Sequence, residues 1–179
     1  METYLEQYNQ QRPQPINKNT FELLLMLFPV LKVIKADGDV DRFEKAFYTE
    51  QLQKQKALDQ HLDEALVKEE IEYILANLDT LNTLFLEALQ AFNQLNGVSD
   101  HLLDLMLGAS RVSYDSWKNN LIYVEPVSWF KMPQKLIAMF LSPDENKKRI
   151  SEAEKNTMLT VLKAVEGLTE RNINILQTL

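Results

Sequence analysis

Apolar residues recur at helical spacing along most of the chain, starting at residue 20. The first such segment, residues 20–34, is apolar on nearly every side, which is typical of a helix buried at the centre of a fold. Pro29 lies within it, and we expect a kink there rather than an end, because the apolar pattern resumes immediately. Residues 1–18 are polar, rich in Gln and Asn, and contain two prolines, so we expect a loose N-terminal arm. Residues 19–179 are then expected to form a single all-helical domain.

The same spacing predicts further helices through the rest of the chain. They are expected at about residues 42–55, 59–77, 80–95, 99–112, 129–141, 151–166 and 169–179. Asn96 and Gly97 form a typical C-terminal stop for one helix, and Gly167 for another. Ser99 is the expected N-cap of the helix that follows Gly97. No segment shows a competing strand alternation, so the predicted fold is all-α, a compact multi-helix bundle.

The amino-acid composition of the chain argues against several classes of function. The 179 residues carry 19 Lys and Arg against 26 Asp and Glu, and this net charge of −7 argues against nucleic acid, which needs a clustered basic surface. The absence of cysteine removes disulfides, thiolate nucleophiles and Cys-ligated zinc, and the four glycines form no phosphate-binding loop. The longest apolar run, residues 23–31, is too short to cross a bilayer, and the N-terminus does not resemble a signal peptide. We therefore expect a cytoplasmic protein without membrane insertion.

An internal repeat relates two distant parts of the chain. Residues 41–44 and 151–154 each follow a β-branched aliphatic residue, and each open an amphipathic helix with a capping residue and a later Glu. In both copies an apolar helix and an Asp precede this turn. We expect the two copies to share one core. The residues buried together there would be Val30, Val33, Ile34, Ile137, Phe140 and Leu141.

The first copy of this repeat resembles the signature of the tellurite-resistance TerB-like family. Residues 35–44 read Lys-Ala-Asp-Gly-Asp-Val-Asp-Arg-Phe-Glu after an apolar helix. In that family an apolar helix ends in Ala-Asp-Gly, followed by an aliphatic residue and a helix opened by x-x-Glu. Residues 143–169 resemble the family's second copy, with Pro-Asp-Glu at the position where Ala-Asp-Gly is usual. The resemblance covers about residues 21–55 and 136–169.

The resemblance implies a compact all-helical fold, a role in bacterial metal and stress resistance, and no enzymatic activity. It also implies that acidic residues near the turns between helices bind metal ions. The residues to which this binding carries over are Asp37, Asp39, Asp41, Glu44, Asp144 and Glu154. Their carboxylate oxygens suit hard divalent cations such as Ca²⁺ or Mg²⁺.

Helix capping is an alternative explanation for part of this acidic set. Asp41 and Glu44 have the spacing of an N-cap residue and its capping-box partner. Ser151 and Glu154 repeat that spacing at the second copy. A cap would account for both residues of each pair without any bound ion.

Capping would leave Asp37 and Asp39 as the carboxylates available to a cation. Gly38, which lies between them, would let the chain turn at positive φ. The loop is not an EF-hand, because Arg42 stands where that loop needs glycine. We expect both aspartates to face solvent without Lys or Arg partners.

Two histidines, a Glu-rich face and an aromatic segment are the remaining candidates. His61 and His101 lack a third nitrogen or sulfur ligand for zinc, and no nucleophile motif accompanies them. The Glu-rich face of residues 63–72 is expected to be solvated. The aromatic segment consists of Tyr114, Trp117, Tyr123, Trp129 and Phe130. Its side chains either fill the core or form a surface for a protein partner.

The leading interpretation is a non-enzymatic, TerB-like stress-response protein with a divalent cation at Asp37 and Asp39 and an unidentified protein partner. The alternative is a metal-free interaction scaffold that acts through the aromatic segment. A metal-dependent hydrolase is a third possibility, but it would need a second acid/base group that does not accompany the carboxylates.

Overall fold

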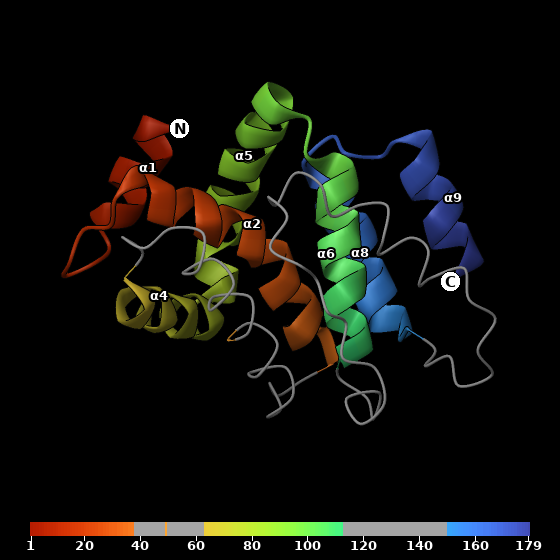
Figure 1. Ribbon diagram of the computed structural model, residues 1–179, viewed down its shortest axis with the longest axis horizontal. Coiled ribbons are helices and arrows are strands. Elements are labelled where there is room, and N and C mark those ends of the chain that lie inside the picture. Colours follow the sequence, from red (N-terminus) through yellow and green to blue (C-terminus); the bar gives the residue numbers. More distant parts are fainter. Residues whose placement is uncertain (38–48, 50–62, 113–149) are drawn as a thin grey trace.

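The computed structural model describes residues 1–37, 49, 63–112 and 150–179, and within these ranges every regular element is helical (Figure 1). The elements are α1 (Glu2–Asn9), α2 (Lys18–Ile34), the 3-10 helix η1 (Lys35–Asp37), α4 (Glu64–Ala76), α5 (Leu78–Asn96), α6 (Ser99–Val112), α8 (Glu152–Ala164) and α9 (Glu170–Thr178). This arrangement confirms the predicted all-α bundle. None of the helices in these ranges has the length and apolarity that a membrane span requires.

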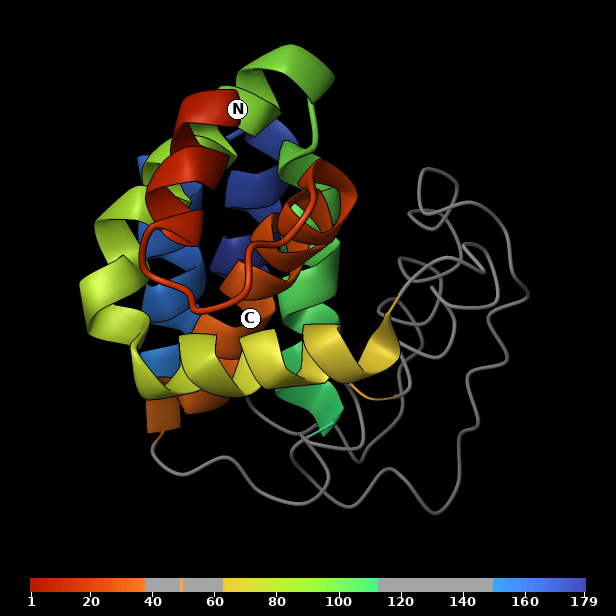
Figure 2. The same cartoon turned by 90° about the vertical axis from the view of Figure 1, so that its left-hand side faces the viewer.

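Helix α2 runs through the middle of the bundle, and α4, α5, α6 and α8 all pack against it (Figures 1 and 2). Its buried positions lie on all sides and include an unbroken run from Leu24 to Leu31. The helix continues past Pro29 to Ile34, so the proline does not end it. The prediction of a central, buried helix is therefore confirmed.

Parts of both sequence repeats belong to one core. That core includes Val30, Val33, Ile34, Met158, Val161 and Leu162. Both α2 and η1 pack against α8, which explains how residues so far apart in the sequence share it. The predicted neighbours Ile137, Phe140 and Leu141 lie outside the residues that the structure describes, so that half of the prediction stays a prediction.

Residues 1–18 do not form the loose arm that we expected. They contain α1, and both Tyr8 and Ile16 are buried. The side-chain amide of Asn9 closes the loop after α1, because it donates to the carbonyl of Ile16 (3.1 Å) and accepts from its N–H (2.9 Å). The polar composition of this segment was misleading, since a few buried side chains are enough to hold a terminal segment on a core.

The turn between α5 and α6 agrees with the prediction at one residue and departs from it at another. Gly97 ends α5 as predicted, with a left-handed φ of 63°. Ser99 is not an N-cap but the first residue of α6, and the carbonyl of Val98 accepts the bond from Leu102 N–H (2.9 Å). The Ser99 hydroxyl donates to Asn93 Oδ1 (2.8 Å), a buried acceptor near the end of α5.

Helix α8 ends in a Schellman motif with Glu166 in the left-handed position. The N–H of Glu166 donates to Lys163 O (3.2 Å), the N–H of Gly167 donates to Leu162 O (2.7 Å), and the φ of Glu166 is 54°. Gly167, which we predicted as the stop, serves a different need. A Cβ at this position would lie 3.0 Å from Ser99 Oγ, so glycine permits the close approach of α8 to the start of α6.

We expect Glu166→Gly to raise the free energy of unfolding by up to about 1 kcal/mol, because glycine adopts a positive φ without the strain of a Cβ. Gly167→Ala should lower it by about 1–3 kcal/mol through overpacking against Ser99. Urea unfolding followed by circular dichroism measures both. Glu166→Ala is the control, since it removes the same carboxylate but keeps the Cβ. An equal gain from Ala and Gly would contradict the backbone explanation.

A buried network of amides ties the turn between α5 and α6 to the turn between α8 and α9. Asn93 Nδ2 donates to Val165 O (2.9 Å), while its Oδ1 accepts from Ser99. Asn172 Nδ2 donates to Gly167 O (2.8 Å). Both asparagines are buried, so these bonds satisfy polar groups that water does not reach. The start of α9 is held to the bundle by this network.

Candidate functional site

The segment before the predicted acidic turn lies at the end of the bundle where α8 begins. η1 directly follows α2 and packs against α8. Both views place the end of α2 beside the N-terminal end of α8 (Figures 1 and 2). Residues 35–37, which follow α2 in the first repeat, therefore lie close to residues 151–154, where the second repeat begins α8.

Few of the residues proposed as cation ligands lie within the described ranges. Asp37 is the last residue of η1, and its side chain lies outside the described part. Asp39, Asp41, Glu44 and Asp144 also lie outside it. The proposed grouping of these carboxylates, and their exposure, stay predictions.

Glu154, the remaining candidate ligand, forms the capping box at the start of α8. Its Oε2 accepts a hydrogen bond from Ser151 N–H (2.7 Å), and Ser151 Oγ accepts one from Glu154 N–H (3.1 Å). The glutamate is 2% exposed. The capping prediction for Ser151 and Glu154 is thus confirmed, and the carboxylate is already engaged in satisfying the helix terminus.

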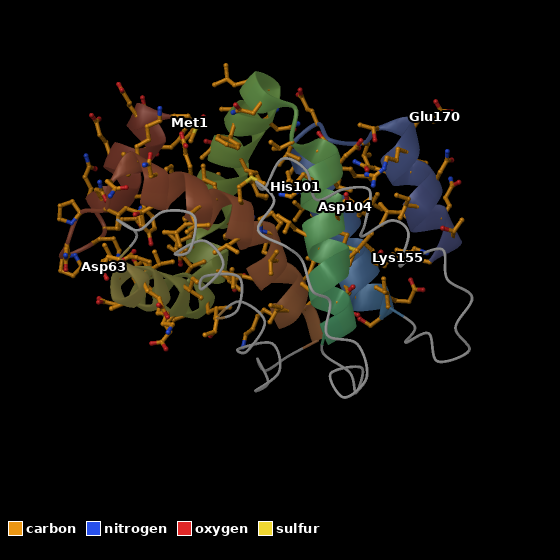
Figure 3. All side chains as sticks on the ribbon, in the orientation of Figure 1. Met1, Asp63, His101, Asp104, Lys155 and Glu170 are labelled. Atoms are coloured by element: carbon orange, nitrogen blue, oxygen red, sulfur yellow. The ribbon has the colours of Figure 1, made fainter. Side chains whose placement is uncertain are left out.

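A second carboxylate cluster, which sequence analysis missed, lies between α6 and α9 (Figure 3). Asp104 on α6 is 1% exposed, and its Oδ1 accepts a hydrogen bond from Arg171 on α9 (2.8 Å). Its Oδ2 has no hydrogen-bond partner among the described residues. Arg171 also lies 3.6 Å from the carboxylate of Asp100. The cluster joins the C-terminal helix to the bundle.

Burial governs the protonation of this region. It raises the pKa of Asp104 above its ordinary value, and the hydrogen bond from Arg171 offsets only part of that effect. Burial also lowers the pKa of His101, one turn earlier on α6, and so favours the neutral imidazole. At Asp104 the upward effect of desolvation on the pKa therefore exceeds the downward effect of the Arg171 cation.

The raised pKa of Asp104 predicts an unusual pH dependence of stability. Native Asp104 holds its proton at pH values where the unfolded chain has lost it, so its contribution to the free energy of unfolding falls as pH rises above about 4. Asp104→Asn mimics the neutral form and removes this titration. Urea unfolding at pH 4 to 7 should show wild type losing stability relative to Asp104→Asn as pH rises. A constant difference, or one that moves the other way, would contradict the assignment.

A third cluster binds the N-terminal segment to α4. Glu70 is 1% exposed, which corrects our expectation that the Glu-rich face of residues 63–72 is simply solvated. The Tyr8 hydroxyl donates to Glu70 Oε2 (2.5 Å), and Arg12 donates to both oxygens of the same carboxylate. The Arg12 guanidinium carbon also lies 3.8 Å from the centroid of the Tyr73 ring. Burial, followed by the hydrogen bond to Glu70, raises the pKa of Tyr8.

The clusters around Asp104 and Glu70 and the capping box of Glu154 consist of contacts within one chain. Within residues 1–37, 63–112 and 150–179, no three His, Asp or Glu side chains are grouped so that they could hold a metal ion. His61 lies outside the described part. No protein-family model, no curated protein and no solved structure matches the chain.

Proposed function

We propose that this chain is a non-enzymatic, TerB-like helical protein of the bacterial metal and stress response. In this proposal Ca²⁺ or Mg²⁺ binds at the turn after α2, through Asp37 and Asp39. The bound ion would fix the turn and so prepare a surface for a protein partner.

The observation that supports this proposal is the packing of η1 against α8. A cation bound just after η1 would lie at the end of the bundle where the two repeats meet. Ordering of the turn by the ion would therefore affect the conformation of both repeats. The buried carboxylates described elsewhere already have partners in the chain, namely Arg12, Arg171 and the Ser151 N–H. Carboxylates on a turn are also the donors that hard cations prefer.

Thermal melts with and without millimolar Ca²⁺ or Mg²⁺ test the proposal. A cation that binds only the native state stabilises it by about 2.7 kcal/mol at a hundredfold excess over Kd. Wild type should therefore melt at a higher temperature with the ion, and an Asp37→Asn, Asp39→Asn double variant should lose this rise. No rise in either protein, or an equal rise in both, would leave the metal-free interaction scaffold as the better explanation.

A matched control separates binding from general charge screening. Glu72 on α4 and Glu87 on α5 are both exposed, and Glu72→Gln with Glu87→Gln removes the same charge. This control variant should keep the full response to the ion. A response reduced as much as in the aspartate variant would assign the effect to net charge.

A further inference from the structure

The N-terminal segment, residues 1–16, packs on the bundle through the buried side chains of Tyr8 and Ile16 and through the ion pair of Arg12 with Glu70. The Tyr8 ring fits among three aromatic rings, with centroid distances of 5.4 Å to Phe85, 5.7 Å to Phe21 and 6.3 Å to Tyr73. These rings come from α5, α2 and α4. We call Phe21, Glu70, Tyr73 and Phe85 the clasp pocket, because they hold this segment.

The polar part of the clasp pocket binds a tyrosine hydroxyl and a guanidinium together. Glu70 accepts hydrogen bonds from the Tyr8 hydroxyl and from Arg12, whose shortest bond to it is 2.9 Å. Arg12 also lies 3.4 Å from Glu69 and covers the face of Tyr73. An unoccupied pocket would leave Glu70 without its countercharge and expose aromatic surface to water. It therefore favours a segment that carries a tyrosine and, four residues later, an arginine.

Release of this segment would uncover part of the core, and the identical segment of another copy would cover it again. The loop of residues 10–17 connects α1 to α2. That loop contains Pro13 and Pro15 and is closed by the paired bonds between Asn9 and Ile16. Opening those two bonds and withdrawing Arg12 and the buried side chains of Tyr8 and Ile16 would release the segment.

We propose that the clasp pocket is an exchangeable docking site whose second occupant is the same segment of another copy of this chain. The two copies would place their N-terminal segments reciprocally, each supplying Tyr8 and Arg12 to the other's Glu70. Charge complementarity between Arg12 and Glu70 selects this occupant, and the exchange remakes in trans every contact that it breaks in cis. The inference is independent of cation binding.

Charge-reversal variants of the full chain test the exchange. Arg12→Glu and Glu70→Arg each place like charges together in cis, so neither can close its own clasp. When the two variants are mixed, both trans pairings are again opposite in charge. We expect the mixture to form a heterodimer of about twice the 20.8 kDa chain mass by size exclusion with light scattering, and each variant alone to stay monomeric. The Arg12→Glu, Glu70→Arg double variant restores the pair in cis and should be a monomer.

Several results would overturn the proposal. A mixture of two folded variants that stays monomeric would do so, as would dimers that form equally well in each variant alone. If the single variants are unfolded, the mixture should regain helical circular dichroism. If it does not, a labelled peptide of residues 1–16 is titrated into full-length Arg12→Ala. That peptide should bind at least about tenfold more tightly than the same peptide carrying Arg12→Glu, and equal or absent binding rejects the exchange.

Discussion

Replacing Arg12 with alanine should lower the free energy of unfolding by about 3–5 kcal/mol, the loss expected when one partner of a buried ion pair is removed. The guanidinium donates hydrogen bonds of 2.9 to 3.1 Å to Glu70, and the Arg12 side chain is 8% exposed. In the variant the Glu70 carboxylate keeps its bond from Tyr8 but loses its countercharge. Urea unfolding followed by circular dichroism at neutral pH measures the loss.

An exposed ion pair provides the control for this prediction. Lys68 lies 2.6 Å from Glu64 on the same helix, with side chains 42% and 21% exposed, so Lys68→Ala should lower stability by at most about 0.5 kcal/mol. Adding Glu70→Gln to Arg12→Ala removes the uncompensated charge and should recover part of the loss. Equal effects of Arg12→Ala and Lys68→Ala would show that the Arg12–Glu70 pair is solvated in solution.

Phe85→Ala should also lower the free energy of unfolding by about 3–5 kcal/mol, because it opens a cavity where several helices meet. The Phe85 ring is fully buried and stacks on Phe28 at a centroid distance of 4.7 Å. It also packs at 5.4 Å from Tyr8 and 5.8 Å from Phe21. Its loss removes contacts to α1 and α2 together, and the same denaturant titration measures it.

Phe92 on the same helix is the matched control. Its side chain is only partly buried against the core, so Phe92→Ala removes the same atoms where water can fill the space. We expect a clearly smaller loss than for Phe85→Ala. Similar losses at the two positions would mean that helix propensity, rather than the aromatic cluster, determines the effect.

Local patterns in the sequence predicted most of the helices but not how they are anchored. The apolar character of α2 on every side predicted its central position, and Gly97 and Ser151 marked a helix end and a helix start. Ser99 lies one residue inside its helix, because Val98 O already accepts the first helical hydrogen bond, and Glu166 rather than Gly167 takes the left-handed position after α8.

The polar clusters were harder to predict, because each joins residues that are far apart in the chain. Glu70 lies in a run of acidic residues that gives no sign of burial, and Arg12 lies in a polar segment. Only the fold brings the two together. The spacing of Ser151 and Glu154 predicted their capping box, because both partners lie within a single turn. The cation ligands proposed from the acidic turn depend on a family resemblance and on the chemistry of carboxylates.

The amide network beside α9 has a consequence for how the molecule opens. α9 has nine residues, fewer than the roughly 12–15 that an isolated helix needs to persist in water. Its helical state therefore depends on tertiary contacts, namely those of Asn172, the clamp between Arg171 and Asp104, and the buried side chain of Leu176. When these anchors release, the C-terminal helix should unravel as one unit while α2 and its neighbours stay folded. We therefore expect α9 to unfold locally at a lower free energy than the rest of the bundle.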